Sequence, residues 1–329
     1  MNFQRTVKLE TPMHKKVRNL QEFLKSYSGK IGLVSHINPD GDAVGSLLGL
    51  YLFLKKAGKR VTPYLAEKVP HYLDFLPDVD KIQSKLDATD IDLIILIDAT
   101  EFSRTGFNAP QTTPIIRIDH HISGRTYSKY DVVIPGAPST ASILLKFARK
   151  YDETLISTDI KKCLYTGLLT DTVSFRHSNS FPWAFKDAYY LVSTNLDVTD
   201  IASLVYERKK IKTLQLLARV LSTIFIRDQV AIITIGKELL LEYNIDRSET
   251  EGFVSYPLSV DEAIVGVSIV EIEEDRWRTS LRGKNKVNLA KVAETFGGGG
   301  HFNAAGCTIN GKLDEVIDSL IRTIKIHKV

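Results

Sequence analysis

Residues 30–58, KIGLVSHINPDGDAVGSLLGLYLFLKKAG, decide the fold. The apolar run at 30–35 predicts a β-strand, and the residues after the "NPDG" turn predict a helix that ends just before Gly58. Three further short apolar runs follow, at residues 60–66, 91–97 and 114–118. Near-continuous apolar strands that alternate with helices indicate a mostly parallel, doubly wound sheet with both faces covered. The N-terminal part is therefore expected to be α/β.

The rest of the chain predicts more helices and then a second kind of sheet. Three helices are expected at residues 139–151, 158–171 and 182–195. Residues 221–236 and 262–283 each predict two strands around a tight polar turn. A helix, a short strand and a last helix follow, at 288–296, near 305–310 and at 313–326. This pattern predicts a smaller α+β domain with an antiparallel sheet.

We expect this architecture to divide the chain into three segments. They are an N-terminal domain at 1–195, a helical linker at 196–222 and a C-terminal domain at 223–329. A chain of 329 residues is long enough for two domains of ordinary size.

Composition narrows the class of protein. No run approaches the ~18 apolar residues that span a bilayer, and the N-terminus lacks the apolar core of a signal peptide. Cys163 and Cys307 lie far apart, so buried, inert thiols and a cytoplasmic location are expected. The net charge of +4 permits an anionic substrate. It does not predict a duplex-DNA binder, and the basic clusters at 207–212 and 322–328 are equally well explained as solvated helix faces.

Acidic and imidazole side chains follow several of the predicted strands. The strand at 30–35 is followed by His36, the strand at 91–97 by Asp98, and the strand at 114–118 by the Asp-His-His run 119–121. A further acid, Asp171, ends the predicted helix at 158–171. In an open parallel sheet, ligands bind beyond the carboxyl ends of the strands. We therefore expect these side chains to gather at one edge.

Each of these residues also has an ordinary structural explanation. Asp40 and Gly41 are common turn residues, and Asp42 could be the N-cap of the following helix. The joint pattern is harder to explain in this way. Clustered carboxylates repel one another and raise each other's pKa unless a cation lies between them. A metal ion supplies that cation.

The ligand types narrow the choice of metal. Carboxylate and imidazole without thiolate favour Mn²⁺ or Mg²⁺, and leave Co²⁺ or Zn²⁺ open. The candidate ligands are His36, Asp40, Asp42, Asp98, His120 and Asp171. This set is too large for one ion with an open position. It suits two ions about 4 Å apart, the arrangement that serves phosphoryl transfer.

Four short motifs resemble those of a known family. "HINPDGDAVGS", "LIDAT", "IDHH" and "GLLTDTVSF" resemble motifs I to IV of the DHH phosphoesterase superfamily, in order and spacing. Residues 280–306, SLRGKNKVNLAKVAETFGGGGHFNAAG, resemble the signature of the DHH-associated C-terminal domain. Length and layout are most similar to the nano-RNase branch, which trims very short RNA and removes phosphate from 3′-phosphoadenosine 5′-phosphate (pAp).

The resemblance implies a role for each candidate ligand. One metal is held by His36 and Asp40, the other by Asp42, His120 and Asp171, and Asp98 bridges the two. A water or hydroxide between the ions is the implied nucleophile. His121 is implied to face the scissile phosphate, and Asp119 to orient a ligand histidine.

The sequence departs from the family at motif IV. Val173 stands where a glycine is usual in the family. Its bulkier side chain is expected to alter the loop that carries Arg176.

Substrate-binding residues are expected from the glycine-rich block and from isolated arginines. Glycines let backbone N–H groups approach an anion closely. The resemblance then implies contacts from Gly298, Gly299, Gly300 and His301, with Arg282 and Lys284 at the phosphate. Arg104 and Arg176 are further candidates, for which surface ion pairs are an equally good explanation.

The leading hypothesis is a metal-dependent hydrolase that cleaves short single-stranded RNA to mononucleotides and pAp to AMP, with Mn²⁺ as the expected metal. A phosphodiesterase for cyclic or linear signalling dinucleotides, such as cyclic di-AMP or pApA, is the first alternative. A pyrophosphatase or exopolyphosphatase, and a catalytically silent nucleotide-binding module, are two others. A homodimer is left open, and no membrane partner is expected.

Overall fold

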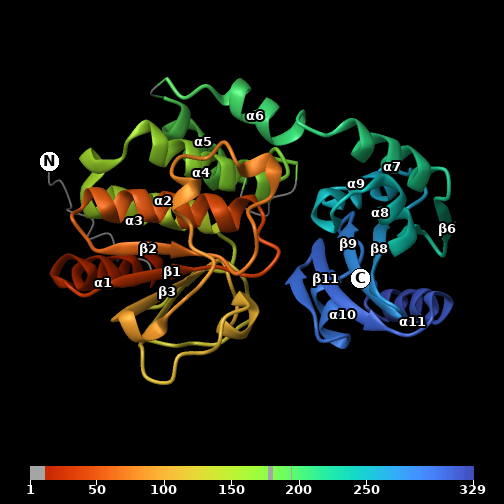
Figure 1. Cartoon of the computed structure of the whole chain (residues 1–329), viewed down its shortest axis with the longest axis horizontal. Coiled ribbons are helices and arrows are strands. Elements are labelled where there is room, and N and C mark those ends of the chain that lie inside the picture. Colours follow the sequence, from red (N-terminus) through yellow and green to blue (C-terminus); the bar gives the residue numbers. More distant parts are fainter. Residues whose placement is uncertain (1–11, 177–180, 194) are drawn as a thin grey trace, which may run out of the picture. The chain divides into compact units, whose positions relative to one another are not determined.

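The computed structural model describes residues 12–176, 181–193 and 195–329. The chain forms two compact units, residues 1–208 and 209–329, each with its own sheet (Figure 1). Residue 194 of the helix predicted at 182–195 lies outside the described residues. No helix in the described ranges is long and apolar enough to cross a membrane.

The first unit contains a five-stranded, wholly parallel sheet. Its strands are β1 (Ile31–Val34), β2 (Val61–Tyr64), β3 (Leu93–Ile97), β4 (Ile115–Asp119) and β5 (Val132–Val133). Their order is β2-β1-β3-β4-β5. The predicted α/β class with a parallel sheet is confirmed. The two-residue strand β5 was too short to be predicted from periodicity.

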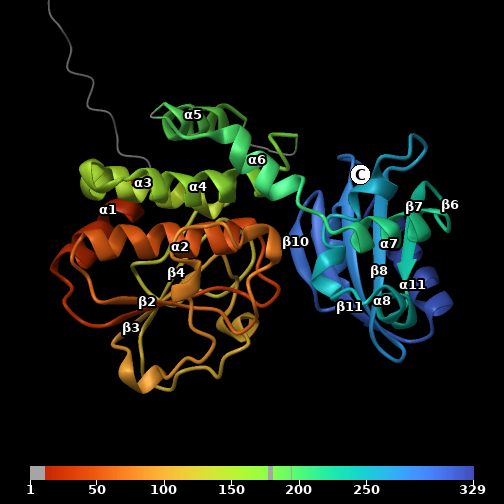
Figure 2. The ribbon, with the colours of Figure 1, turned by 45° about the horizontal axis from the view of Figure 1, so that its top comes forward.

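One face of this sheet is covered by α-helices. The helices on this side are α1 (Pro12–Ser26), α2 (Gly41–Lys56), α3 (Thr140–Asp152), α4 (Thr158–Asp171), α5 (Phe181–Val192) and α6 (Val198–Tyr206). Of these, α1, α2 and α3 contact the strands, whereas α4, α5 and α6 pack on other helices. Within this group α2, α3 and α4 pack against one another (Figure 2). The alternate strand side chains, such as Val34, Ile94 and Leu96, form a separate cluster with Phe102 from a 3₁₀ turn. The opposite face is thus covered by loops and short 3₁₀ helices where α-helices were expected.

The short 3₁₀ helices occupy the connections. They are η1 (His71–Leu73), η2 (Val79–Lys81), η3 (Ala88–Asp90), η4 (Phe102–Thr105), η5 (Glu153–Leu155) and η6 (Arg247–Thr250).

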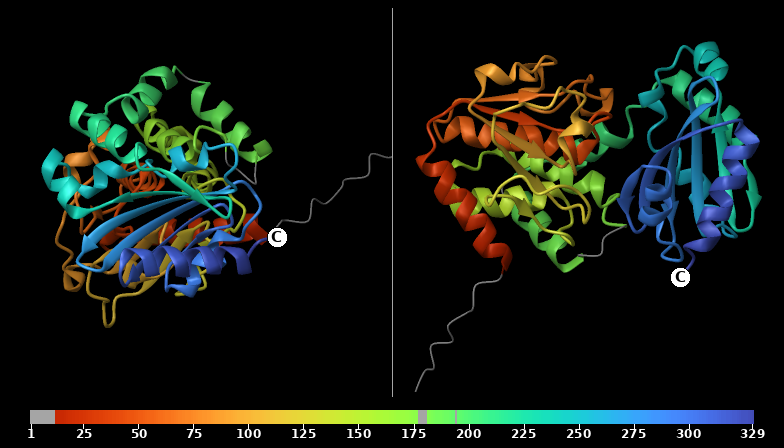
Figure 3. Two further views of the ribbon diagram at one scale, coloured as in Figure 1. Left: turned by 90° about the vertical axis from the view of Figure 1, so that its right-hand side faces the viewer. Right: turned by 90° about the horizontal axis from the view of Figure 1, so that it is seen from below.

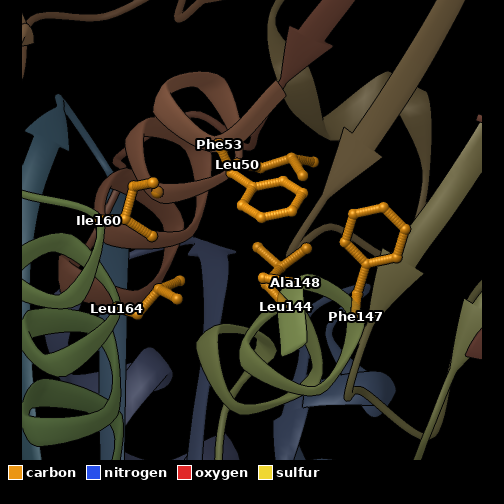
Figure 4. Close-up of a pocket in the computed structure, with 8 residues that line it drawn as sticks. Leu50, Phe53, Leu144, Phe147, Ala148, Ile160 and Leu164 are labelled. Carbon is orange, nitrogen blue, oxygen red and sulfur yellow. The ribbon is translucent and has the colours of Figure 1, made fainter. Parts of the chain in front are cut away.

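The packing between α2, α3 and α4 is entirely apolar at its centre. Leu50 and Phe53 of α2 meet Leu144 and Phe147 of α3 and Leu164 of α4 (Figure 4). No polar side chain lines this space. It is therefore core packing and offers no chemistry.

The second unit is built on a six-stranded mixed sheet. Its strands are β6 (Phe225–Arg227), β7 (Val230–Ile235), β8 (Val265–Glu273), β9 (Arg276–Gly283), β10 (Gly299–His301) and β11 (Ala304–Asn310). The order is β10-β11-β9-β8-β7-β6. The expectation of an antiparallel sheet is wrong at one pair, since β7 and β8 are parallel. Parallel strands need a long crossover, and residues 236–264 supply it.

Five α-helices complete this unit. They are α7 (Ile211–Leu221), α8 (Lys237–Tyr243), α9 (Ser255–Leu258), α10 (Leu289–Thr295) and α11 (Leu313–Ile326). The α8 and α9 helices lie in the crossover between β7 and β8. The α11 helix runs along one face of the sheet, where Val316 and Leu320 join its core (Figure 3).

The segment predicted as a linker, 196–222, contains two helices. The α6 helix contacts α4 and η1 of the first unit, and α7 contacts α8 and β7 of the second. The division between the units falls between Arg208 and Lys209. The predicted domain limits stay a prediction.

A buried acid on α5 gives a pH-dependent stability prediction. Asp187 is 6% exposed, and burial raises its pKa to about 6, although Ser142 and Lys146 act in the opposite direction. A carboxyl with a raised native pKa stabilises the fold in its protonated form, and this contribution is lost as the pH rises through about 6.

We therefore expect the wild-type chain to lose about 2 kcal/mol of unfolding free energy relative to Asp187→Asn between pH 4 and pH 7. Urea titrations of both proteins at several pH values measure this difference. A difference that stays constant with pH would contradict it.

Candidate metal centre

The predicted metal ligands of the first unit meet at the carboxyl edge of the parallel sheet. Strands β1, β3 and β4 are neighbours in register, with Val34 beside Leu96 and Ile97 beside Ile118. The Ser35 hydroxyl donates to the carbonyl oxygen of Ile97 at 2.7 Å and ties two strand ends together. The loops that follow these strands therefore leave the sheet side by side.

The turn before α2 separates the roles of its two aspartates. Asp40 is the N-cap of α2, because its Oδ1 accepts from the backbone N–H of Ala43 at 3.0 Å. The suggestion that Asp42 caps this helix is wrong. Asp42 lies in the first turn, is 1% exposed, and accepts from the backbone N–H groups of Thr140 at 2.6 Å and Ala141 at 3.0 Å. It thus binds the N-terminus of α3, where helices favour negative charge.

Asp98 lies at the centre of the cluster. It is 3% exposed, its backbone is left-handed with φ +52°, and its Oδ1 accepts from the Thr140 hydroxyl at 2.8 Å. It belongs to each of three groups in the first unit whose ligand atoms lie within 4.8 Å of one another. These groups are His36–Asp40–Asp98, Asp42–Asp98–His120 and Asp98–Asp119–His121.

The two adjacent histidines are held in different ways. His120 places Nδ1 3.1 Å from the carbonyl oxygen of Ala137, so this nitrogen carries the proton. Its Nε2 lies 3.5 Å from Oδ2 of Asp171 and 3.7 Å from Oδ1 of Asp98. His121 instead donates from Nδ1 to Asp119 at 2.7 Å. The histidine that Asp119 orients is therefore His121, whereas His120 is oriented by a backbone carbonyl.

The charge balance of this cluster favours a bound cation. Burial raises the pKa of Asp98 well above its ordinary value, and the nearby charges of Asp42 and Asp40 raise it further. Burial likewise raises the pKa of Asp42. Burial alone would lower the pKa of His120, but the carboxylates of Asp171 and Asp98 raise it to about 10. Carboxylate and imidazole donors crowded in this way suit a hard divalent ion such as Mn²⁺ or Mg²⁺.

Arg117 is a residue that the sequence analysis missed. It is 2% exposed and pairs through its guanidinium with the fully buried Asp119. The same guanidinium donates to the carbonyl oxygens of Ala99 at 3.0 Å and Ser123 at 2.7 Å. Burial would raise the pKa of Asp119, but His121 and Arg117 hold it well below its usual range. A charged residue inside the apolar strand "PIIRI", two positions before Asp119, was the available signal.

A second missed feature is the glycine spacing on α2. Gly41, Gly45 and Gly49 recur every four residues and form one ridge of the helix. A Cβ atom on Gly45 would lie 2.5 Å from the carbonyl oxygen of Cys163 in α4. These glycines therefore allow α2 to lie against α4, the helix that carries Asp171.

This close approach predicts a large effect for one methyl group. We expect Gly45→Ala to lower the unfolding free energy by about 1–3 kcal/mol, because the added carbon meets rigid backbone. Gly306→Ala is the matched control, since its Cβ would meet nothing nearer than 3.4 Å. Urea denaturation of both variants gives the comparison. Equal stability of the two variants would contradict the proposed packing.

The two arginine candidates of the first unit lie in loops. Arg104 is exposed in η4, and its carbonyl oxygen accepts from the N–H of Ile37 at 2.8 Å, which ties this loop to the motif I turn. Arg176 is exposed and donates to the carbonyl oxygen of Val173 at 3.1 Å. Val173 has φ +49°, a conformation costly for a β-branched residue and easy for glycine. The departure at motif IV thus places strain on the loop that holds Arg176.

The glycine-rich block of the second unit has a packing role. Gly299–His301 form strand β10 instead of an open loop. A Cβ on Gly298 would lie 2.2 Å from the carbonyl oxygen of Gly306, and one on Gly300 would lie 2.4 Å from that of Ala304. Close strand pairing therefore explains two of these glycines. Their phosphate contacts stay a prediction.

The remaining predicted substrate residues also lie in the second unit. Arg282 is on strand β9, opposite Ala304 of β11. Lys284 follows this strand and donates from Nζ to the carbonyl oxygen of Val260 at 2.8 Å.

Two domain families match the chain in the order that the motifs predict. Residues 30–168 match the DHH family, N-terminal domain, and residues 227–326 match the DHHA1 domain. Together the two matches cover more than two thirds of the chain. The chain belongs to the DHH family. Its class of chemistry is the hydrolysis of phosphoester bonds, and the predicted family is confirmed.

Individual relatives of this DHH-family chain resemble it over nearly its full length. The bifunctional oligoribonuclease and PAP phosphatase NrnA of Thermus thermophilus is 29% identical over 316 residues, 94% of each chain. The solved structure of an exopolyphosphatase-related protein from Bacteroides fragilis has a TM-score of 0.81 and 26% identity, covering 95% of this chain and 96% of that one.

A more distant structure shares the fold. Thermus thermophilus RecJ in complex with Mn²⁺ has a TM-score of 0.56 and 14% identity, over 97% of this chain and 55% of RecJ.

Proposed function

We propose that this DHH-family chain hydrolyses short oligoribonucleotides to mononucleotides and pAp to AMP, with two divalent ions at the candidate metal centre. The observation that carries the proposal is the position of Asp98 in each of the three ligand groups within the first unit. The substrate class comes from the Thermus relative named as an oligoribonuclease and PAP phosphatase. That relative covers 94% of this chain, so the comparison includes both domain families.

The donor set divides between two ions in this proposal. His36 and Asp40 would hold one ion, and Asp42, His120 and Asp171 the other, with Asp98 shared. Mn²⁺ is the proposed ion because the donors are carboxylates and imidazoles. Bound ions would supply positive charge for the phosphate oxygens and an activated water.

The protein's own residues position the reacting groups. Thr140 holds Asp98 through its hydroxyl and Asp42 through its backbone N–H, so one residue fixes both acids. Asp119 holds the His121 ring by the Nδ1 proton, and we propose that this ring neutralises charge on the scissile phosphate. Arg282 and His301 of the second unit, with the glycines of β10, are proposed to bind the substrate phosphate.

A substrate panel in Mn²⁺ tests the proposal. Purified protein is incubated with RNA dimers to pentamers, pAp, cyclic di-AMP, pApA and pyrophosphate, and released products are separated by chromatography. We expect mononucleotides from RNA and AMP from pAp, and no turnover in excess chelator. No product from RNA or pAp, with protein that is folded and metal-loaded, would refute the proposal.

A second candidate function has one observation in its favour. The Bacteroides structure that matches with a TM-score of 0.81 is described as exopolyphosphatase-related. Phosphate release from pyrophosphate or polyphosphate that exceeds release from pAp would favour this alternative. A homodimer and a cytoplasmic location stay predictions within the proposal.

A further inference from the structure

Strand β9 of the second unit presents two different faces. Trp277, Thr279 and Leu281 are buried, and Trp277 and Leu281 join the core formed with α10 and α11. The alternate residues Arg278 and Arg282 are half-buried and lie on the opposite face, because successive side chains of a strand alternate. With Arg276, arginine therefore occurs three times on this face, whose β8 side is covered by a separate core that contains Val270, the residue opposite Arg278.

The neighbouring strand completes an open surface beside these arginines. In the register of β9 and β11, Arg282 lies opposite Ala304, Ser280 opposite Gly306, and Arg278 opposite Thr308. Ala304 and Gly306 are partly exposed, and Thr308 is exposed. Small side chains between the two arginines leave the β11 side of this face accessible to a flexible ligand, whereas Leu258 of α9 packs on Gly266 at its β8 side.

The strands β9, β10 and β11 contribute no acidic side chain to this surface. Strands β9, β10 and β11 have the sequences RWRTSLRG, GGH and AAGCTIN, none of which contains an acidic residue. The arginine at the turn end of β9, Arg276, is paired with Glu273 at 3.2 Å. A strip with arginines, hydroxyls and no carboxylate on its own strands is complementary to a chain of phosphates.

We propose that Arg278 binds a second phosphate of single-stranded RNA, different from the phosphate that is assigned to Arg282. This inference rests on the proposed function. The two residues are four apart on one strand, so their Cα atoms are about 13 Å apart and their side chains stand roughly parallel. They therefore bind different phosphates. The phosphates of pAp flank a single ribose, so pAp reaches Arg282 without Arg278.

The test compares binding of a long and a short ligand by the full chain. Affinities for a 3′-fluorescein-labelled pentaadenylate are measured by fluorescence anisotropy in excess EDTA, and pAp is measured by competition. Arg278→Gln is expected to weaken pentamer binding about tenfold or more and pAp binding less than twofold. The slope of log Kd against log salt for the pentamer should fall by about 0.7, the value for one phosphate contact on a single strand.

Arg276→Gln is the matched control, with the same change of charge on the same strand. It is expected to alter pentamer binding less than twofold. Equal weakening of pentamer and pAp by Arg278→Gln, no weakening of either, or no pentamer binding by the wild-type chain would overturn the inference. A wild-type chain that binds the pentamer through Arg278 but releases no nucleotide in Mn²⁺ would refute the proposed hydrolysis and still support this binding face.

Discussion

Asp98→Asn is expected to lower Mn²⁺-dependent release of nucleotide by about 10³-fold or more. Asp98 is the residue common to the three ligand groups, so its loss affects both proposed ions. Metal ions contribute several kcal/mol to such reactions, and about 1.4 kcal/mol corresponds to a tenfold change in rate. Initial rates on pAp and on an RNA trimer measure the effect. Asp80→Asn, at an exposed site paired with Lys81, is the control and should retain full activity.

The same variant has a second readout that does not depend on turnover. The buried Asp98 carboxylate is costly without a cation, as the raised pKa of this group indicates. In excess EDTA the Tm of Asp98→Asn should therefore equal or exceed that of the wild type. Mn²⁺ should raise the Tm of the wild type and raise that of the variant much less. An active Asp98→Asn enzyme, or an equal Mn²⁺ shift in both proteins, would remove Asp98 from the metal centre.

Arg117→Met is expected to lower the unfolding free energy by about 3–5 kcal/mol, because it leaves the buried Asp119 charge without its partner. Removal of the Arg117 guanidinium should also reduce activity, since its partner Asp119 holds the Nδ1 atom of His121. Arg117→Lys should rescue little, because an ammonium cannot reproduce the fork that contacts Asp119, Ala99 and Ser123. Urea denaturation and steady-state kinetics give the two measurements.

A double variant separates the stability of this pair from its role in activity. Arg117→Met combined with Asp119→Asn removes both charges, so it should be more stable than the sum of the single effects predicts, by about 1–3 kcal/mol. Its activity should stay about 10–100-fold below wild type, because a neutral amide orients His121 less strongly. Additive losses of stability would show that Arg117 and Asp119 do not act as a pair.

The sequence alone predicted the strands with a regular apolar pattern and the polar side chains that follow them. The apolar runs at 30–35, 91–97 and 114–118 became β1, β3 and β4, since buried parallel strands are near-continuous in apolar residues. Parallel strands end at one edge of a sheet, and this brought His36 and Asp98 together as expected. Local pattern and topology therefore determined most of the candidate site.

The features that could not be predicted from the sequence depend on contacts between distant segments. The pairing of Arg117 with Asp119 could not be told from an exposed strand charge until burial was known. The parallel pairing of β7 and β8 required the crossover through α8 and α9, which a local turn pattern does not reveal. Thr140 contacts Asp42 and Asp98 across 98 and 42 residues, and no local motif marks it.

The central claim is that the carboxylate and imidazole cluster around Asp98 holds two divalent ions. Isothermal titration of the metal-free chain with Mn²⁺ at pH 7.5 tests it most directly. We predict two Mn²⁺ ions per wild-type chain, and fewer than two for Asp98→Asn at the same concentrations. No Mn²⁺ binding by the wild type, or two ions bound with equal affinity by Asp98→Asn, would contradict the account.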